Sequence, residues 1–508
     1  MKTKLVVLVT FLTFNVFAQI SKIDGINTFS LKNAGAILDK NKDVDGYYFY
    51  YVIDKLKKGE NEFAIQILDK NLNEVAKKTY VDNKNTFLMN SSFNNQNLMF
   101  AMANFKEKKI DLLTFDKQAN QQKTISITLE KKEIQYLELM RQYSSDFNML
   151  FPVDNKGFIL NKFEDNKKIG YSLKYYATDG GKSWEFNSPD DSKEILFINP
   201  IEVNEKIIVA IEMAKPGMLS RKMTLRTKVI DVETGKLLFE IENSKKDKPR
   251  LINNAFIDKD NNIILMGEYF KDGDNIFDDK SLGLFTQVLD LKGKQIKEVF
   301  TTWSGDVSKI AKTSNGFIDE KGYVYFHKIV KTKGNEYYAI GEYYKRIVSA
   351  GGMAMKIISQ GQASATKISI TDAVVFKFNS DFKLVSIKDF QKTKSNVPSV
   401  TDFGSPQLNA HALKAFGSFD YSYTQIDAVN DRFYACFVDY EKEKGQKSKN
   451  AFKTIIYDDG ELSEDKIYLK DDDKEFEVLP AKVGNVLLVE YDKKKKSINI
   501  RLEKINIK

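Results

Sequence analysis

Short apolar segments recur along the chain at a nearly constant spacing. The eight copies begin at Tyr47, Leu98, Phe158, Ile207, Ile263, Tyr323, Phe433 and Val486. Six of the seven steps between them lie between 49 and 60 residues, and one step, from Tyr323 to Phe433, is 110 residues long. Self-similarity at a period of about 50 residues is typical of repeat architectures such as propellers. We therefore expect one repeated unit along the whole chain.

Each unit has the pattern of an antiparallel meander of four strands. Polar turns such as Asp154–Gly157 and Asp258–Asn261 precede several copies, and Asp, Asn and Gly tolerate the left-handed conformations of tight hairpins. After the copies come alternating segments that end in Asp and Gly, for example Leu284–Lys294, and then short amphipathic segments such as Gln295–Phe300. Alternation with a period of two predicts strands.

These patterns predict an all-β protein, a β-propeller of about eight four-stranded blades, because radial stacking of the units buries both faces of each sheet. Seven blades with an extra hairpin, or two smaller propellers, are the alternatives. The last unit shows only three strands before the chain ends. An unpaired edge must be covered, so we expect residues near the mature N-terminus, Ile26–Leu31, to supply the missing strand.

Two stretches inside the 110-residue step do not fit the strand pattern. Residues 346–362 carry apolar side chains around Gly351 and Gly352, which indicates a short helix or a buried loop. Residues 405–416 have helical spacing between Pro406 and Gly417, which predicts a short connecting helix. We interpret both as insertions in a single propeller domain that spans residues 19–508.

The N-terminus predicts export. Lys2 and Lys4 precede the apolar run Leu5–Phe17, and Ala18 provides a small-residue cleavage site, so residues 1–18 read as a signal peptide. The run is shorter than the roughly 20 residues of a membrane-spanning helix. We expect a periplasmic or extracellular protein without a membrane span and without an internal disulfide, since Cys436 is the only cysteine.

The charge of the chain is nearly balanced despite a formal net charge of +8. The 78 Lys and Arg residues face 70 Asp and Glu residues, and both signs are scattered along the sequence. Nucleic-acid-binding proteins instead gather basic residues in a patch or stripe. Nucleic acid is therefore not an expected partner.

One segment, Ala177–Trp184, has the specificity of a family motif. It resembles the Asp-box, Ser-x-Asp-x-Gly-x-Ser/Thr-Trp, a hairpin found between the third and fourth strands of many propeller blades. Asp179, Gly181, Ser183 and Trp184 match the motif, and Ala177 departs from it. The resemblance implies a propeller in which these residues staple a hairpin, and it leaves the activity open. The whole chain also resembles uncharacterised secreted bacterial proteins.

Sequence motifs for chemistry are absent. His327 and His411 are the only histidines and have no Cys or His at ligand spacing, so we predict no metal site, no cofactor and no catalytic residue. The acidic segment Asp272–Asp279 could supply calcium ligands, but it lacks the spacing of a known calcium loop. We interpret it as a solvated connection between strands.

A cluster of tyrosines is the candidate binding surface: Tyr337, Tyr338, Tyr343 and Tyr344. If exposed, they would form an aromatic platform for a glycan or a protein; if buried, they belong to the third strand of the sixth unit. The leading hypothesis is a monomeric, exported, non-catalytic binding or scaffolding protein that presents a propeller face to an extracytoplasmic protein or glycan partner.

Two other functions stay open at this stage. A glycosidase-like enzyme acting on extracellular polysaccharide could bring together two acidic residues from distant blades, which sequence spacing would not reveal. A structural envelope protein without a small ligand is the third hypothesis.

The first prediction concerns processing of the N-terminus. Because the apolar run ends at Ala18, the mature protein should begin at Gln19. Intact-mass analysis of protein recovered from the envelope and from the medium measures this directly. Recovery of a chain that retains Met1 would contradict the prediction.

Overall fold

The computed structural model describes residues 19–39, 41–143, 148–165, 169–217, 220, 222–244, 247–276, 278–348, 366–399, 404–441, 449–469 and 475–506. The predicted signal peptide, residues 1–18, lies outside the described residues. So does most of the predicted insertion at 346–362, of which only 346–348 are described.

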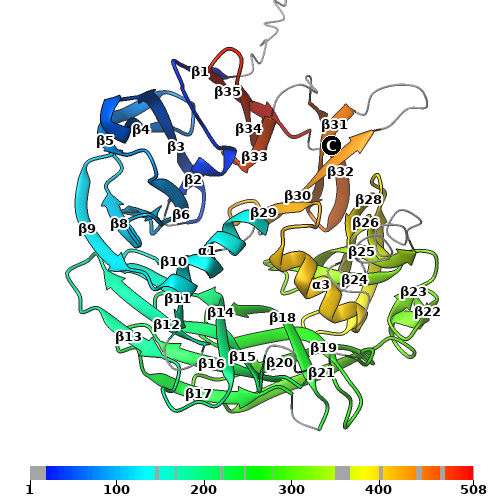
Figure 1. Cartoon of the computed structure of the whole chain (residues 1–508). Coiled ribbons are helices and arrows are strands. Elements are labelled where there is room, and N and C mark those ends of the chain that lie inside the picture. The colour runs from blue at the N-terminus through cyan, green and yellow to red at the C-terminus, as the bar shows by residue number, and fades with distance from the viewer. Residues whose placement is uncertain are drawn as a thin grey trace, which may run out of the picture.

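Eight antiparallel sheets stand as blades around a central axis (Figure 1). Blades 1 to 4 contain β2 (Ala34–Leu38), β3 (Val44–Lys55), β4 (Glu60–Asp69), β5 (Glu74–Asn83); β6 (Phe87–Phe93), β7 (Leu98–Asn104), β8 (Lys109–Phe115), β9 (Gln121–Thr128); β10 (Leu150–Val153), β11 (Gly157–Asp165), β12 (Ile169–Ala177), β13 (Trp184–Asn187); and β14 (Ile195–Val203), β15 (Ile207–Lys215), β16 (Thr224–Asp231), β17 (Leu237–Glu242). The first strand of each blade is the inner one.

Blades 5 to 8 follow in the same order. They contain β18 (Arg250–Ile257), β19 (Ile263–Tyr269), β20 (Gly283–Leu289), β21 (Gln295–Thr302); β24 (Tyr323–Lys331), β25 (Tyr337–Val348), β26 (Thr366–Phe378), β27 (Leu384–Phe390) with β28 (Ser395–Pro398) beside β26; β29 (Tyr421–Asp427), β30 (Arg432–Glu441), β31 (Lys449–Asp458), β32 (Glu461–Tyr468); and β33 (Glu475–Pro480), β34 (Asn485–Asp492), β35 (Ser497–Lys504), β1 (Ile20–Asp24). The eight-bladed β-propeller is confirmed, and both alternatives are excluded.

The hydrophobic core lies between the blades. Eight large apolar clusters each join two successive blades, and the last of them joins blade 8 to blade 1. In the cluster between blades 1 and 2, Tyr50 and Phe63 pack against Phe100. A single sheet would leave one apolar face in water, so the ring is the arrangement in which every blade buries both faces.

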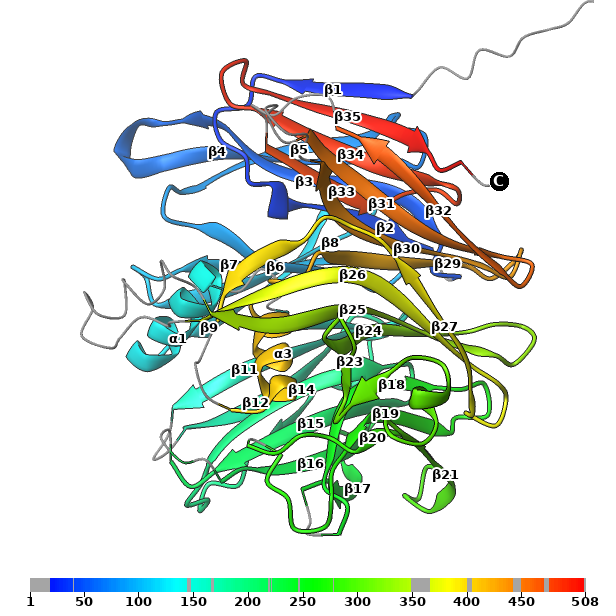
Figure 2. The same cartoon turned by 90° about the vertical axis from the view of Figure 1, so that its right-hand side faces the viewer.

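The ring is closed by the N-terminal strand, but not by the residues expected. β1 pairs antiparallel with β35, from Ile20 opposite Arg501 to Asp24 opposite Ser497, and forms the outer edge of blade 8 (Figure 2). The expected strand Ile26–Leu31 instead crosses to blade 1, where Thr28 bridges Val52. The prediction of N-terminal closure is correct in kind and wrong in its residues, because five residues upstream already complete the sheet.

Aspartate side chains fix many of the turns, as the sequence predicted. Asp69 Oδ1 accepts hydrogen bonds from the backbone N–H groups of Asn71 and Asn73 at 2.8 and 2.9 Å. The residue between them, Leu72, has a φ of 66°. Asp116, Asp258 and Asp290 accept the equivalent pairs of hydrogen bonds. The carboxylate holds the turn even where a bulky residue takes the left-handed conformation.

The sixth apolar copy is out of register with the others. Tyr323 begins β24, the inner strand of blade 6, whereas each of the other copies lies in the second strand of its blade. A small hairpin, β22 (Thr313–Ser314) and β23 (Phe317–Ile318), precedes β24. The turn that connects β23 to β24, Asp319–Gly322, has the same residue types as the hairpin turns within the blades. This turn and the burial of β24 produced the false match.

Two α-helices lie in connections between blades. α1 (Lys131–Tyr143) leads from blade 2 to blade 3, and α3 (Pro406–Ala415) leads from blade 6 to blade 7. Both lie in front of the centre of the ring in Figure 1, on the face where the inner strands begin, which we call the proximal face. α3 occupies the segment in which a connecting helix was expected, and Ser405 caps it by accepting from the Leu408 N–H at 3.2 Å. Among the described residues, no helix has the length and hydropathy to span a membrane.

The hairpin at Asp179 joins the third and fourth strands of blade 3. The N–H of Gly181 donates to Asp179 Oδ1 at 2.9 Å, and the N–H of Ala177 donates to Ser183 Oγ at 3.3 Å. Trp184 follows the hairpin, stacks on Tyr175 at 5.5 Å and donates from Nε1 to the Val232 carbonyl of blade 4 at 2.6 Å. The indole therefore packs one blade onto the next.

Replacing this indole should destabilise the contact between blades 3 and 4. Trp184→Ala removes the stacking partner of Tyr175 and the cover of Gly235, whose added Cβ would lie 2.5 Å from the indole. We expect the free energy of unfolding to fall by about 2 to 4 kcal/mol in denaturant titrations. Trp184→Phe, which keeps a ring and loses the hydrogen bond, should cost only about 1 kcal/mol. An unchanged stability of Trp184→Ala would contradict this packing role.

Candidate functional site

The inner edge of blade 1 is incomplete at the proximal face. β2 ends its pairing with β3 at Ala34 opposite Phe49, yet β3 continues to Lys55. The chain that should extend β2 instead turns through η1 (Leu31–Asn33), after the bridge between Thr28 and Val52. The segment 25–33, called here the crossing segment, thus pairs with β3 at Val52 but does not continue the regular pairing of β2 with β3 beyond Phe49.

A cavity of about 810 Å³ lies beside the crossing segment, between blades 1 and 2. Its walls come from the crossing segment, β3, β4, the start of blade 2, α1 and β33. Ligand pockets typically measure about 300 to 1,000 Å³. This cavity is therefore the candidate binding site of the molecule.

Four cations lie around the opening of the cavity, and they come from four different elements: Lys32, Lys55, Lys84 and Arg141. All four side chains are exposed. Within the described ranges, none of them forms an ion pair. Among the described residues of the lining, Glu477 is the only one with a carboxylate. The opening therefore carries a local excess of positive charge that the almost balanced composition of the chain does not reveal.

Helix α1 brings Arg141 to the cavity. Glu133 in its first turn accepts from the Glu130 N–H at 2.8 Å and pairs with Lys162 of blade 3 at 3.0 Å. Leu137 packs into the apolar cluster between blades 2 and 3. The last turn then places the Arg141 guanidinium 5.0 Å from the centre of the Phe87 ring. Burial of one helix face thus positions a charged side chain at the cavity.

The interior of the cavity is lined by neutral side chains. Asn61 is 9% exposed, and Asn33 is half-buried. Neither side-chain amide forms a hydrogen bond with a described residue. Leu31, Leu88 and Met89 are half-buried and add apolar surface. The interior can therefore exchange hydrogen bonds with an uncharged polar ligand group, whereas the opening favours an anion.

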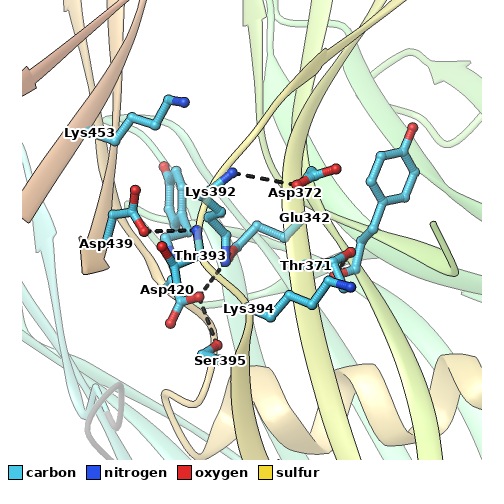
Figure 3. A network of polar contacts seen from close by, with 12 residues as sticks. Glu342, Thr371, Asp372, Lys392, Thr393, Lys394, Ser395, Asp420, Asp439 and Lys453 are labelled. Carbon is cyan, nitrogen blue, oxygen red and sulfur yellow. Dashed lines mark hydrogen bonds and ion pairs between the residues drawn. The ribbon is translucent and has the colours of Figure 1, made fainter. Parts of the chain in front are cut away.

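A second polar cluster lies in blade 6, next to blade 7 (Figure 3). Glu342 on β25 has Oε1 3.1 Å from the Lys392 Nζ and Oε2 3.1 Å from the His327 Nε2. All three side chains are 0% exposed. The N–H of Tyr421 donates to the same carboxylate at 2.9 Å.

Lys392 connects this carboxylate to blade 7. It also pairs with Asp420, which precedes β29 and accepts from the Ser395 hydroxyl at 2.8 Å. The N–H of Thr393 donates to Asp439 Oδ1 at 2.9 Å. Lys392 points inward from a gap in the outer edge of β26, between the residues paired with β27 and those paired with β28.

The charges of the cluster depend on one another. Burial would raise the pKa of the Glu342 carboxyl, but Lys392 and His327 outweigh burial and lower it. Burial would lower the pKa of Lys392, yet the two carboxylates raise it. Burial, reinforced by the charge of Glu342, raises the pKa of Asp420. With no exposed surface on its central residues, the cluster offers no place for a substrate, and we interpret it as a clamp between blades.

The predicted aromatic platform is wrong. Tyr337, Tyr338, Tyr343 and Tyr344 are all buried, with exposures between 1% and 6%. They lie on β25, which is the second strand of blade 6 and not the third. Both faces of this strand pack against neighbouring blades, so alternate tyrosines are buried on opposite sides.

The other sequence candidates have local structural roles. Asp274 and Asp279 accept hydrogen bonds from the loop N–H groups of Lys271 and Asn275 at 3.2 and 2.7 Å. His411 on α3 contacts Asn253 of blade 5 at 2.9 Å. Across the part of the chain that the structure describes, no three His, Cys, Asp or Glu side chains form a group that could hold a metal.

Sequence reasoning missed the cavity and α1. Ile134 and Leu137 have the spacing of one helix face, so α1 could have been recognised. The cations are 23 to 57 residues apart in sequence, and nothing in their local context indicates that they converge.

One comparison with known proteins places the chain in a family. A model described as "Family of unknown function (DUF6770)" matches residues 1–506. A search of curated proteins found no match.

Among solved structures, the chain is similar to prolyl oligopeptidase B from Galerina marginata bound to a 25mer macrocyclization substrate, with a TM-score of 0.41 and 7% identity over 91% of this chain and 55% of that one. It thus spans about half the length of that enzyme. It is also similar to the β-propeller domain of the Trilobed protease from Pyrococcus furiosus, with a TM-score of 0.33 and 13% identity over 77% and 100% of the two chains. TolB from Acinetobacter baumannii has a TM-score of 0.26 and 9% identity over 96% of each chain. These values are too low to indicate a shared activity.

Removing the charge of Lys392 should destabilise the fold, because its carboxylate partners would lose their counter-charge. Lys392→Met leaves Glu342 and Asp420 without their shared partner, and breaking a buried ion pair costs about 3 to 5 kcal/mol. We expect this loss of unfolding free energy at neutral pH in denaturant titrations. The loss should shrink as the pH falls, because protonation neutralises the stranded carboxylates. Lys394→Met removes an exposed lysine of the same segment and should change stability little; equal losses in the two variants would contradict the clamp.

Proposed function

The chain belongs to the DUF6770 family, whose function is unknown, and we propose that it is an exported, non-catalytic binding protein. It presents the proximal face of its propeller to an extracytoplasmic glycan or protein. The observation that carries this proposal is the cavity between blades 1 and 2, which is lined by four cations that form no ion pair with any residue the structure describes.

The composition of the cavity favours binding over hydrolysis. Glycoside hydrolysis uses two carboxyl groups on either side of the scissile bond, and the described part of the cavity lining contributes one carboxylate, that of Glu477. Glu342, whose side chain is fully buried, and Asp420, which is half-buried, are both paired with Lys392. No observation favours the glycosidase-like alternative at this site.

Export and the domain assignment are part of the same proposal. The signal-like N-terminus supports a periplasmic or extracellular protein, in which residues 19–508 form one monomeric propeller domain. We interpret the hairpin at Asp179 as an Asp-box with Ala177 in place of Ser. The contacts of Asp179 with Gly181 and of Trp184 with blade 4 support a structural role for the motif.

Affinity electrophoresis combined with a reducing-end assay tests the proposal. Residues 19–508 are run through gels that contain polygalacturonate, xylan or dextran, and the same mixtures are assayed for new reducing ends. We expect retardation by at least one polysaccharide without release of reducing ends. Lys55→Glu/Lys84→Glu, which reverses two charges of the cavity opening, should abolish the retardation.

The control is Lys57→Glu, an exposed lysine of the same blade outside the cavity lining, which should behave as the wild-type chain does. Reducing ends that accumulate in proportion to protein concentration would contradict a non-catalytic role. Retardation that survives in the double variant would contradict the assignment of the cavity.

A further inference from the structure

We infer that the ligand of the cavity between blades 1 and 2 is an anionic saccharide, whose acidic group lies at the opening and whose hydroxyl groups enter the interior. This rests on the proposed binding function and assigns its ligand class. The inference combines the distribution of charge, the free amides, the apolar surface and the blocked strand edge of this one cavity.

The charge distribution requires an acidic group at the opening. Lys32, Lys55, Lys84 and Arg141 approach it from the crossing segment, β3, the connection between blades 1 and 2, and α1. Other lysines of the propeller form ion pairs, for example Lys162 with Glu133 and Lys228 with Glu240. Like charges that converge without a partner repel one another, and a bound anion turns this repulsion into attraction.

The interior requires a neutral, hydroxyl-rich body. Asn61 is nine-tenths buried and lines the cavity, and its side-chain amide has no hydrogen-bond partner among the described residues. A side-chain amide offers both donors and an acceptor, and a hydroxyl group both donates and accepts. Leu88 and Met89 on the wall can pack against the C–H faces of a sugar ring.

An acidic peptide fits the same cavity less well. Extended peptides commonly bind by adding a strand to an exposed sheet edge. Here the inner edge of β3 is already taken, because the Val52 N–H donates to the Thr28 carbonyl at 2.9 Å and the Val52 carbonyl accepts from Asn27 at 2.8 Å. The crossing segment therefore occupies the backbone groups that a peptide would need.

Calorimetric titration of residues 19–508 with four matched oligomers tests the ligand class. The probes are oligogalacturonate, which carries carboxylates, a sulfated dextran oligosaccharide, a neutral maltooligosaccharide and oligoglutamate. We expect one or both of the anionic saccharides to bind, with an affinity that falls as salt rises. The stronger of the two identifies the acidic group as a carboxylate or a sulfate.

Variants separate the two halves of the cavity. The double variant Lys55→Gln/Lys84→Gln should lower the affinity for the anionic saccharide by at least about tenfold, since hydrogen bonds to charged groups contribute more than neutral ones. Asn61→Ala should lower the same affinity by roughly fivefold. Lys57→Gln is the matched surface control and should leave the affinity within about twofold. Thermal unfolding of each variant verifies that it folds.

Three outcomes decide the inference. Preferential binding of oligoglutamate, with no effect of Asn61→Ala, would overturn the saccharide and leave a binding protein for acidic peptides. If the neutral maltooligosaccharide bound as tightly as the acidic oligomers, the inference that the ligand is anionic would be overturned, while the proposed binding function would stand. Failure of both anionic saccharides to bind would also overturn the inference, whereas hydrolysis of either would overturn the proposed function itself.

Discussion

Ring closure requires the first described strand to pair with the last one, so that β1 becomes the outer edge of blade 8. The chain must then travel from this outer edge to the inner strand of blade 1 across the proximal face. It does so through the crossing segment, where Ile26 donates to the Lys496 carbonyl at 3.0 Å and Thr28 bridges Val52. Because this path replaces the upper half of an inner strand, closure and the cavity have the same physical origin.

The charges between blades 6 and 7 are paired with one another, whereas the cations at the cavity between blades 1 and 2 are not. Between blades 6 and 7, Glu342, Lys392 and Asp420 neutralise one another away from water. Burial without partners would be costly there, which explains the clamp. At the cavity between blades 1 and 2, the cations stay solvated and unpaired within the described ranges. We therefore interpret the clamp as a structural element and the cavity as a ligand-binding site.

Local patterns were sufficient to predict the blades. Period-two alternation and Asp-led turns follow from the geometry of one strand and one hairpin, so residues such as Asp258 and the strand Leu284–Leu289 could be assigned directly. The false register of Tyr323 arose where an insertion supplied a similar turn. The tyrosines on β25 could not be recognised as buried, because neighbouring blades cover both faces of this strand.

The site could not be predicted, since it depends on contacts between distant segments. Arg141 reaches the cavity only because α1 packs on blade 3, and Lys32 only because β2 does not begin until Ala34. The clamp likewise assembles His327, Glu342 and Lys392 from three separate segments.

The most direct measurement of the central claim is a crystal structure of residues 19–508 grown with oligogalacturonate. The account predicts a sugar in the cavity between blades 1 and 2, with its carboxylate within about 4 Å of at least two of the four cations. It also predicts a ring hydroxyl on the Asn61 amide, with the crossing segment still paired to Val52. A sugar bound on another face, with the cavity empty and its cations in solvent, would contradict it.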